Sequence, residues 1–253
     1  MMVSDALLQD GFAVFDAEPS VLAWAKVAHA KAMDIAQDPQ IRAGNLRHGA
    51  TWFVGVDALP NAPDGSIDHV PLSGEWQSFV DLPEVWHAAQ LSVIYPGYPR
   101  QDRDESDANH RFRRDRHAAH VDGLLPVGPT RRRYVQEPHG FILGLPLNRA
   151  TASPLMVWPG SHRIMNAALR TAIGAQQLDV VDVTSPYKIA RKQVFETVVP
   201  RPVQALPGQA ILLHRHLLHG VAPWSAGAVA PPEGRMVAYF RPQTTSVAWL
   251  SPN

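Results

Sequence analysis

The chain has 253 residues, and its 23 lysine and arginine side chains balance 23 aspartate and glutamate side chains. Such a neutral chain lacks the positive charge of nucleic-acid-binding domains, and the absence of cysteine excludes disulfides, thiolate zinc sites and cysteine nucleophiles. No apolar run approaches the roughly 20 residues that span a bilayer. Residues 1–5 also lack the basic start and apolar core of a secretory signal. Composition therefore predicts a soluble, cytoplasmic protein that binds neither nucleic acid nor membrane.

We expect one domain over residues 1–253, with a helical flank over about residues 1–40. The residues from Asp10 to Phe15 read as a turn and a short strand. A helix then opens at Pro19 and ends before Pro39, because apolar residues recur at helical spacing between them. The residues that form this apolar face are Val21, Trp24, Ala25, Ala28, Ala32 and Ile35.

The second half of the chain is rich in short strand patterns separated by turns. One helix interrupts the series, with Ser161 as its predicted cap and Gly174 as its end. Residues 97–117 carry so many charges of both signs that we expect an inserted surface loop there. Many short strands predict a mainly β fold with flanking helices, as in a sandwich or jelly roll. The predicted strands are 118–122, 139–145, 154–158, 196–199, 203–205, 210–214 and 236–240.

The candidate chemistry centres on His120 and Asp122. On a strand, residues i and i+2 point to the same side, so this imidazole and this carboxylate would share one space. Two histidines and one carboxylate on one face of an octahedron bind Fe(II) in non-haem oxygenases and leave three positions open. About one His-x-acid pair is expected by chance in a chain with 12 histidines. A surface ion pair would also look the same, so the pair needs a third partner.

A later element can supply that partner. A turn at Pro207-Gly208 leads into an apolar strand and then into a short strand ending in His219. Arg235 follows at the start of the strand 236–240. A guanidinium there can hold a carboxylate through two parallel hydrogen bonds. A dicarboxylate that chelates iron at one end would need such a group at its other end.

These features, in this order along the chain, resemble the phytanoyl-CoA dioxygenase-type Fe(II)/2-oxoglutarate oxygenases. The resemblance covers about residues 8 to 240 and implies a double-stranded β-helix, the jelly-roll or cupin-like barrel. It implies that Fe(II) binds His120, Asp122 and His219, that Arg235 and His139 contact 2-oxoglutarate, and that O2 is the second co-substrate. The matching segments are Asp10-Gly11-Phe12, His120-Val121-Asp122, Pro159-Gly160-Ser161-His162, Pro207-Gly208 to His219-Gly220, and Arg235.

Two features depart from the family pattern. Relatives often carry a serine two residues beyond the distal histidine, where this chain has Val221. The connection between His219 and Arg235 is also longer than usual, so Arg241 is a second candidate for the 2-oxoglutarate clamp.

Other histidines compete for the third metal position. His214 and His216 share one side of their strand, but the resemblance favours His219 because relatives place the ligand on the second strand of this element. We expect His162 to belong to the start of the helix after the Pro-Gly turn. His110 and His117 lie in the charged segment, where a solvated role is the simpler interpretation.

The resemblance implies hydroxylation of a small organic substrate, with oxidative decarboxylation of 2-oxoglutarate to succinate and CO2. Halogenating relatives carry a small residue at the position of Asp122, so the aspartate favours hydroxylation. Two alternatives stay open: a non-catalytic barrel that binds a metal or small ligand, and a metal-dependent barrel enzyme that does not use 2-oxoglutarate. Arg235 separates them, because only a 2-oxoglutarate enzyme needs a cation there.

The chain has 19 arginines against 4 lysines, and nine of the arginines fall within residues 100–133. A positive rim would attract an anionic substrate such as a carboxylate, a phosphate or an acyl-CoA. We favour the simpler interpretation, in which these arginines form a solvated face and pair with the six acidic residues of the same segment.

Overall fold

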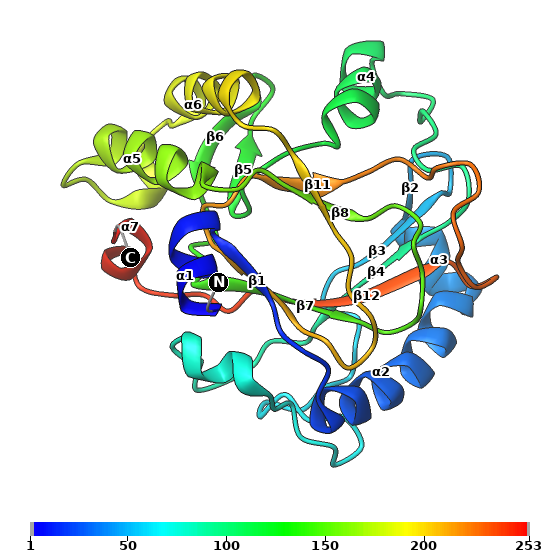
Figure 1. Cartoon of the computed structure of the whole chain (residues 1–253). Helices are drawn as coiled ribbons and strands as arrows, with labels where there is room; N and C mark the ends of the chain where they lie inside the picture. Colours follow the sequence, from blue (N-terminus) through cyan, green and yellow to red (C-terminus); the bar gives the residue numbers. More distant parts are fainter. Residues whose placement is uncertain (1–2, 252–253) are drawn as a thin grey trace.

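Two antiparallel sheets lie at the centre of the molecule, with helices around them (Figure 1). The computed structural model describes residues 3–251, so the ends of the predicted domain span, residues 1–2 and 252–253, lie outside the described residues. The prediction of a mainly β, jelly-roll-type fold with flanking helices is confirmed.

The larger sheet has the strand order β1-β10-β7-β12-β4-β3-β2, and the smaller sheet has the order β11-β8-β9. A separate hairpin joins β5 to β6. The larger sheet consists of β1 (Phe12–Val14), β10 (Ile211–His214), β7 (Phe141–Pro146), β12 (Arg235–Phe240), β4 (Gln90–Ile94), β3 (Trp52–Gly55) and β2 (Leu46–Arg47). The others are β11 (His219–Val221), β8 (Leu155–Val157), β9 (Arg201–Val203), β5 (Leu124–Val127) and β6 (Arg132–Val135).

Helices flank the sheets, and none in the described part of the chain is long and apolar enough to cross a membrane. The α-helices are α1 (Val3–Asp10), α2 (Pro19–Gln37), α3 (Pro39–Asn45), α4 (Asp107–Arg116), α5 (Ser161–Ile173), α6 (Thr184–Thr197) and α7 (Ser246–Leu250). Two short 3₁₀ helices are η1 (Glu75–Phe79) and η2 (Leu178–Val180).

The outer face of the larger sheet packs against α2. Trp24 of this helix is completely buried, and its indole Nε1 donates to the carbonyl of Gly65 at 2.8 Å. Burying each large apolar side chain of this layer contributes about 1.5–3 kcal/mol. The predicted apolar face of the helix is confirmed, since Val21, Trp24, Ala25, Ala28 and Ala32 are all buried there and Ile35 is partly buried.

Alternation along β12 divides its side chains between two layers. Met236, Ala238 and Phe240 join the layer shared with α2, whereas Val237 and Tyr239 join a second apolar cluster with residues of β8 and β10. This second cluster fills the space between the two sheets. Arg235 has the same parity as Val237 and Tyr239 and therefore belongs to the inner face.

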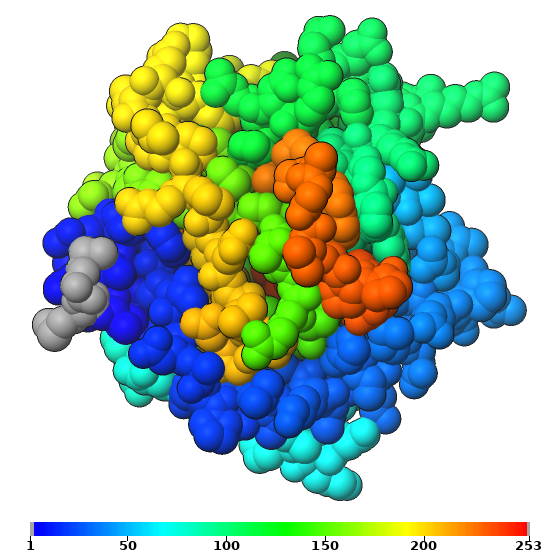
Figure 2. Space-filling view, turned by 45° about the vertical axis from the view of Figure 1, so that its right-hand side comes forward, coloured from blue at the N-terminus to red at the C-terminus, as the bar shows by residue number. Residues whose placement is uncertain are grey.

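A long connection, residues 222–234, runs from β11 to β12 over one face of the molecule. In Figure 2 this orange segment lies beside the green connection between β7 and β8. The contact is hydrogen-bonded, because Thr151 N donates to Val229 O at 2.7 Å and Val229 N donates to Thr151 Oγ1 at 3.0 Å. The unusual length of this segment therefore does not displace β12 from its place beside β4 and β7.

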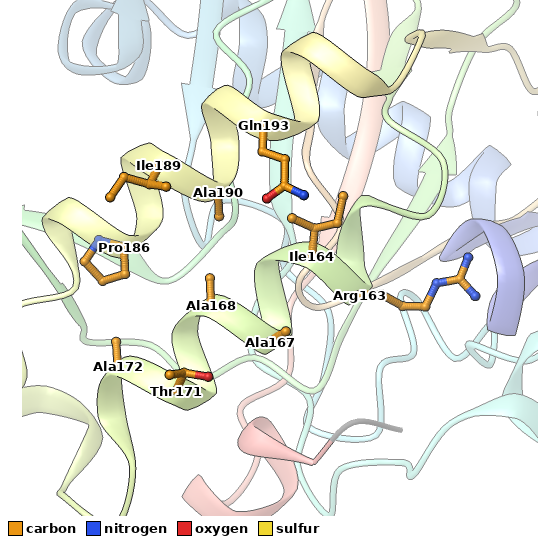
Figure 3. A pocket seen from close by; sticks show the side chains of 10 residues that line it. All are labelled: Arg163, Ile164, Ala167, Ala168, Thr171, Ala172, Pro186, Ile189, Ala190 and Gln193. Atoms are coloured by element: carbon orange, nitrogen blue, oxygen red, sulfur yellow. The ribbon is translucent and has the colours of Figure 1, made fainter.

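The helices α5 and α6 form a third packed layer beside the smaller sheet. A groove of about 780 Å³ runs between these two helices (Figure 3). The side chains that line it include one charged group, Arg163, and neither a carboxylate nor an imidazole. This groove therefore offers no ligand set for the predicted metal chemistry.

Three local predictions are wrong. Residues 118–122 form no strand; only His120 makes an isolated bridge, to His219. The predicted strand 196–199 is wrong because α6 continues to Thr197. The segment 97–117 is not a loop throughout, since α4 begins after Ser106, whose Oγ accepts from Asn109 N at 3.3 Å. An exposed, strongly charged helix carries little apolar periodicity, which is why the sequence pattern missed it.

The start of α5 also differs from expectation. Gly160, not Ser161, is the N-cap residue, and the Ser161 hydroxyl instead accepts from Leu218 N at 3.0 Å. This bond joins the helix to the segment just before β11. The residue after the Pro-Gly turn thus makes a long-range hydrogen bond, to Leu218, that the local sequence pattern did not predict.

Three histidines gather at the base of α5, away from the predicted metal residues. The ring of His162 lies 4.9 Å from that of His214, and His216 lies 5.5 Å from His214 and 4.3 Å from the ring of Trp249 in α7. His162 and His216 are fully buried. Burial, followed by the charge of Arg163, lowers the pKa of His162 to about 4. Burial, followed by the neighbouring His214, holds the pKa of His216 well below its usual value.

His162 and His216 make stability depend on pH. Below about pH 6.5 they take up protons in the unfolded chain but not in the folded one, so stability is greatest above pH 6.5 and falls toward pH 4. Each contributes a slope of ~1 kcal/mol per pH unit in that window. Urea unfolding followed by circular dichroism should show a midpoint that declines from pH 7 to pH 5. His162→Leu should reduce the slope by about one proton, whereas His69→Asn, at an exposed position, should leave it as in the wild type; equal slopes in all three proteins would contradict this account.

Candidate metal centre

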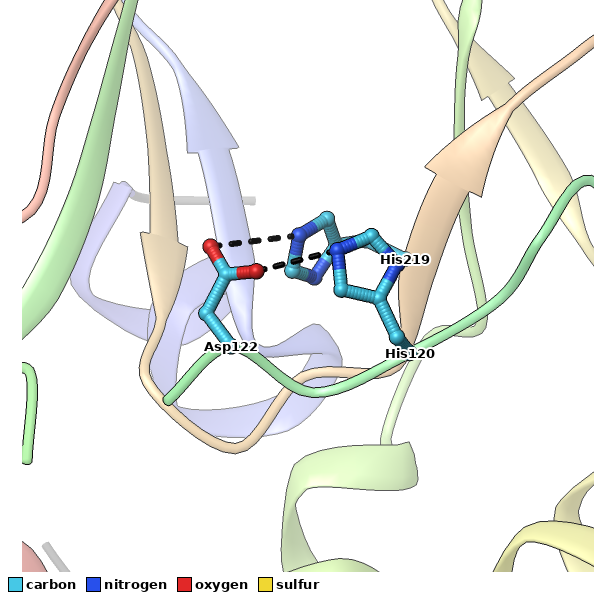
Figure 4. Close-up of side chains that lie close together, drawn as sticks. All are labelled: His120, Asp122 and His219. Atoms are coloured by element: carbon cyan, nitrogen blue, oxygen red, sulfur yellow. Dashed lines mark ion pairs between the residues drawn. The ribbon is translucent and has the colours of Figure 1, made fainter. Parts of the chain in front are cut away.

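Three side chains predicted from the sequence meet at one point. His120, Asp122 and His219 each offer a ligand atom, and these atoms all lie within 4.8 Å of one another. His120 Nε2 is 3.0 Å from Asp122 Oδ1, and His219 Nε2 is 3.7 Å from Asp122 Oδ2. Figure 4 shows both imidazoles directed at the carboxylate. The arrangement is a two-histidine, one-carboxylate set of the kind that can hold a divalent transition metal.

The backbone brings the two histidines together. His120 N donates to His219 O at 2.9 Å, and His219 N donates to His120 O at 3.1 Å. This reciprocal pair places His120 beside β11, which is itself paired with β8. Asp122 reaches the same point through bends in the chain and not through strand alternation, because Ala118 and Gly123 have φ of 52° and 78°.

Two glycines permit the close approach of chain segments around the ligands. A Cβ on Gly123 would lie 1.9 Å from Glu137 O, and a Cβ on Gly220 would lie 2.1 Å from His117 O. Any side chain at either position would push neighbouring backbone away. The residues next to Asp122 and His219 in sequence therefore have to be glycine for the present geometry.

Each histidine ligand is fixed by a carbonyl two residues earlier. His120 Nδ1 lies 2.9 Å from Ala118 O, and His219 Nδ1 lies 2.9 Å from Leu217 O. A carbonyl oxygen can only accept, so Nδ1 carries a proton in both rings and Nε2 is the nitrogen that faces the carboxylate. A hydrogen bond of this kind orients a metal-binding imidazole and selects its tautomer. Both rings thus present Nε2 to the centre.

The charges of the site are set by burial and by Arg241. Burial by itself raises the pKa of Asp122, but the Arg241 guanidinium, and then His219 and His120, outweigh it and hold this pKa well below the usual range. Burial lowers the pKa of His219 to about 4, in spite of the neighbouring carboxylate. At neutral pH the site therefore offers an ionised carboxylate and, at His219, a neutral imidazole, the forms that bind metals.

Arg235 begins β12, as predicted, and is 7% exposed. Its Nη1 is buried and has no hydrogen-bond partner among the described residues. An unpaired buried guanidinium nitrogen is costly, so such an atom points to an anionic group that completes it. This arginine lies on the face that carries Val237 and Tyr239, the face turned toward the smaller sheet.

His139 is buried just before β7 and close to Gly123. Its Nδ1 donates to the carbonyl of Arg241 at 3.0 Å, and its Nε2 lies 3.4 Å from Glu137 Oε2. Its predicted contact with 2-oxoglutarate stays a prediction. The rivals for the third metal position, His214 and His216, belong to the histidine group near Trp249 and do not join His120 and Asp122.

Arg241 itself contacts a predicted metal ligand. Its Nε donates to Asp122 Oδ2 at 2.5 Å, and its Nη1 donates to Gln90 Oε1 at 2.6 Å. The sequence indicated Arg241 only as a second candidate for the 2-oxoglutarate clamp, and it did not single out Gln90 or His87. The Nε2 atom of His87 accepts a hydrogen bond from Arg241 N at 2.7 Å. A glutamine at the start of the largely apolar strand β4 is a signal that could have pointed toward this place.

Three of the nine arginines in the arginine-rich segment, residues 100–133, form ion pairs within the protein. Arg113 pairs with Glu105 at 3.0 Å, Arg114 with Asp115 at 2.7 Å, and Arg132 with Asp182 at 2.6 Å. Two of these three acids lie within the segment itself, in agreement with the simpler interpretation of its charges.

Comparison with known proteins finds relatives in structure but not in sequence. No family model and no curated protein matches this chain. Among solved structures, SnoK, a non-heme alpha ketoglutarate dependent carbocyclase from nogalamycin biosynthesis, superposes with a TM-score of 0.51 and 12% identity, over 94% of this chain and 83% of SnoK. The structure of EctD from S. alaskensis with 2-oxoglutarate and 5-hydroxyectoine superposes with a TM-score of 0.45 and 18% sequence identity, over 94% of this chain and 73% of EctD. The similarity to SnoK shows that the two proteins share a fold.

The close approach at Gly123 can be tested by substitution. In Gly123→Ala the new methyl group collides with the Glu137 carbonyl, so Asp122 should move and Co(II) affinity should fall at least tenfold in anaerobic calorimetry. Gly128→Ala is the matched control, because Gly128 also has a positive φ, of 68°, but no atom lies within 4 Å of the place that its new methyl group would take. Equal losses of affinity in both variants would show that backbone strain alone, and not the displacement of Asp122, is responsible.

Proposed function

We propose that this protein is an Fe(II)/2-oxoglutarate-dependent oxygenase of the phytanoyl-CoA dioxygenase type, which hydroxylates a small organic substrate. The observation that carries the proposal is the convergence of His120, Asp122 and His219, with both histidine Nε2 atoms directed at the carboxylate. These residues would hold Fe(II) and leave three positions open. Bound iron would supply the activation of O2, coupled to the decarboxylation of 2-oxoglutarate to succinate and CO2.

The residues fit the co-substrate as well as the metal. 2-Oxoglutarate is a dicarboxylate, and Arg235 offers a buried guanidinium nitrogen with no partner in the described chain. In the proposal, Arg235 holds the distal carboxylate from inside the barrel, and the apolar side chains of Val237 and Val157 exclude water from the space between the sheets. The SnoK fold, in an enzyme described as alpha ketoglutarate dependent, supports this assignment.

The exposed edge of the site gives the substrate a direction of approach. The side chain of His120 is 43% exposed, whereas those of Asp122 and His219 are 11% and 7% exposed. We therefore place the substrate on the His120 side, with the co-substrate on the buried side. In the proposal this substrate is a small molecule, and an anionic group on it could meet the arginines of residues 100–133 that form no ion pair with an acidic side chain.

The alternatives differ in what they require of Arg235. A non-catalytic binding barrel, or a metal enzyme that does not use 2-oxoglutarate, has no need for a buried cation inside the barrel. The unpartnered Nη1 of Arg235 thus favours the 2-oxoglutarate enzyme over both.

An anaerobic titration tests the proposal. Fe(II) followed by 2-oxoglutarate should give a visible metal-to-ligand charge-transfer band that requires both additions. In His219→Ala the band should be absent. In Arg235→Ala it should need at least tenfold more 2-oxoglutarate, because the charge-assisted hydrogen bonds to the distal carboxylate are lost.

The matched control is Arg132→Ala, which removes an arginine from an exposed ion pair. Its titration should follow that of the wild type. Iron binding without a band would favour the two alternatives. A wild-type protein that binds no iron would refute the assignment of the three ligands.

A further inference from the structure

Arg241 follows β12 directly and reaches the carboxylate of Asp122. The two side chains are mostly buried, 20% and 11% exposed, and Nε donates to Oδ2 at 2.5 Å. A second nitrogen of the same guanidinium, Nη1, donates to Gln90 Oε1 at 2.6 Å. The guanidinium is therefore fixed between β4 and the predicted metal ligand.

The main chain of Arg241 is held as firmly as its side chain. Its N–H donates to His87 Nε2 at 2.7 Å, and its carbonyl accepts from His139 Nδ1 at 3.0 Å. The guanidinium carbon also lies 5.3 Å from the ring centroid of Tyr239. These contacts come from separate segments of the chain, so the position of Arg241 is set before any ligand arrives.

The two oxygens of Asp122 have different partners. Oδ1 faces His120 Nε2 at 3.0 Å, whereas Oδ2 receives the charge-assisted hydrogen bond from Arg241 and lies 3.7 Å from His219 Nε2. A carboxylate with both oxygens free can bind a cation through both, and a guanidinium on one oxygen competes for that oxygen.

We propose that Arg241 is a positioning residue that retains Oδ2 of Asp122, so that the carboxylate presents Oδ1 alone to the metal. This inference rests on the proposed function. The hydrogen bond shares the negative charge of the ligand with a fixed cation, which weakens metal binding. It also prevents the second oxygen from occupying a position that the co-substrates need.

This role differs from the clamp for 2-oxoglutarate. Arg235 and Arg241 stand at opposite ends of β12, and a rise of about 3.3 Å per residue separates their backbones by roughly 20 Å. Arg241 is at the end beside Asp122, and its Nε and Nη1 are already engaged by Asp122 and Gln90.

Metal affinity without turnover tests the inference. Anaerobic calorimetry with Co(II) alone should show at least fivefold tighter binding to Arg241→Met than to the wild type, because a cation beside the ligand has been removed. Arg241→Lys, which keeps the charge, should stay closer to the wild type than Arg241→Met. Gln90→Met, which removes only the support of Arg241, should be intermediate. Arg132→Met is the control for the loss of an arginine, and thermal unfolding checks that each variant is folded.

A second measurement tests whether one coordination position of the bound iron stays free for a further ligand. Nitric oxide binds ferrous iron where a position is free, so the wild-type protein with Fe(II) and 2-oxoglutarate should give a stoichiometric S = 3/2 paramagnetic resonance signal. In Arg241→Met this signal should fall at least threefold, because Oδ2 can now bind the metal.

The outcomes separate the two proposals. Unchanged or weaker Co(II) binding in a folded Arg241→Met protein would overturn the inference, as would a full nitric oxide signal. A wild-type protein that binds neither Co(II) nor Fe(II) would instead overturn the proposed function.

Discussion

The reciprocal backbone hydrogen bonds between His120 and His219 are the constraint on which the candidate site depends. They join a bent segment to the first residue of β11, about one hundred positions later in the chain. Each histidine then directs Nδ1 to the carbonyl two residues before it, so the same local arrangement is used twice. Because these hydrogen bonds hold both the backbone and the two rings, both Nε2 atoms face the carboxylate.

The buried charge of Asp122 needs a partner in the absence of metal. An isolated carboxylate in such a place would cost several kcal/mol or would take up a proton. Arg241 opposes both outcomes, and together with His219 and His120 it outweighs the effect of burial on the pKa of Asp122. The same contact that stabilises the buried carboxylate also limits what that carboxylate can offer to a cation. In our proposal, the hydrogen bond between Arg241 and Asp122 therefore stabilises the fold and at the same time weakens metal binding.

Three separate apolar clusters make up the core around the candidate site. The layer between the sheets is an apolar cluster of residues mainly from β7, β8, β9, β10 and β12. The layers under α2 and under α5 and α6 are independent apolar clusters that hold the sheets in place. The His162, His214 and His216 group belongs to this support, between α5 and α7. Histidine therefore has at least two separate uses in this chain, one in packing and one in the candidate site.

Local periodicity and turn residues in the sequence predicted the mainly β fold class, the helix α2 and the position of Arg235 at the start of a strand. The three residues that converge were predicted through the resemblance to the oxygenase family, because the residues alone left His214 and His216 open as the third partner. Only the tertiary structure decided how they converge. The predicted strand 118–122 is a bent segment with one bridge, because pairing with β11 and the turn at Gly123 override local strand preference. The contacts of Arg241 with Asp122 and Gln90 join positions 119 and 151 residues apart. No local sequence pattern predicts contacts between residues so far apart in the chain. These contacts form only because β4 and β12 pair and the segment after β12 continues to the end of the barrel.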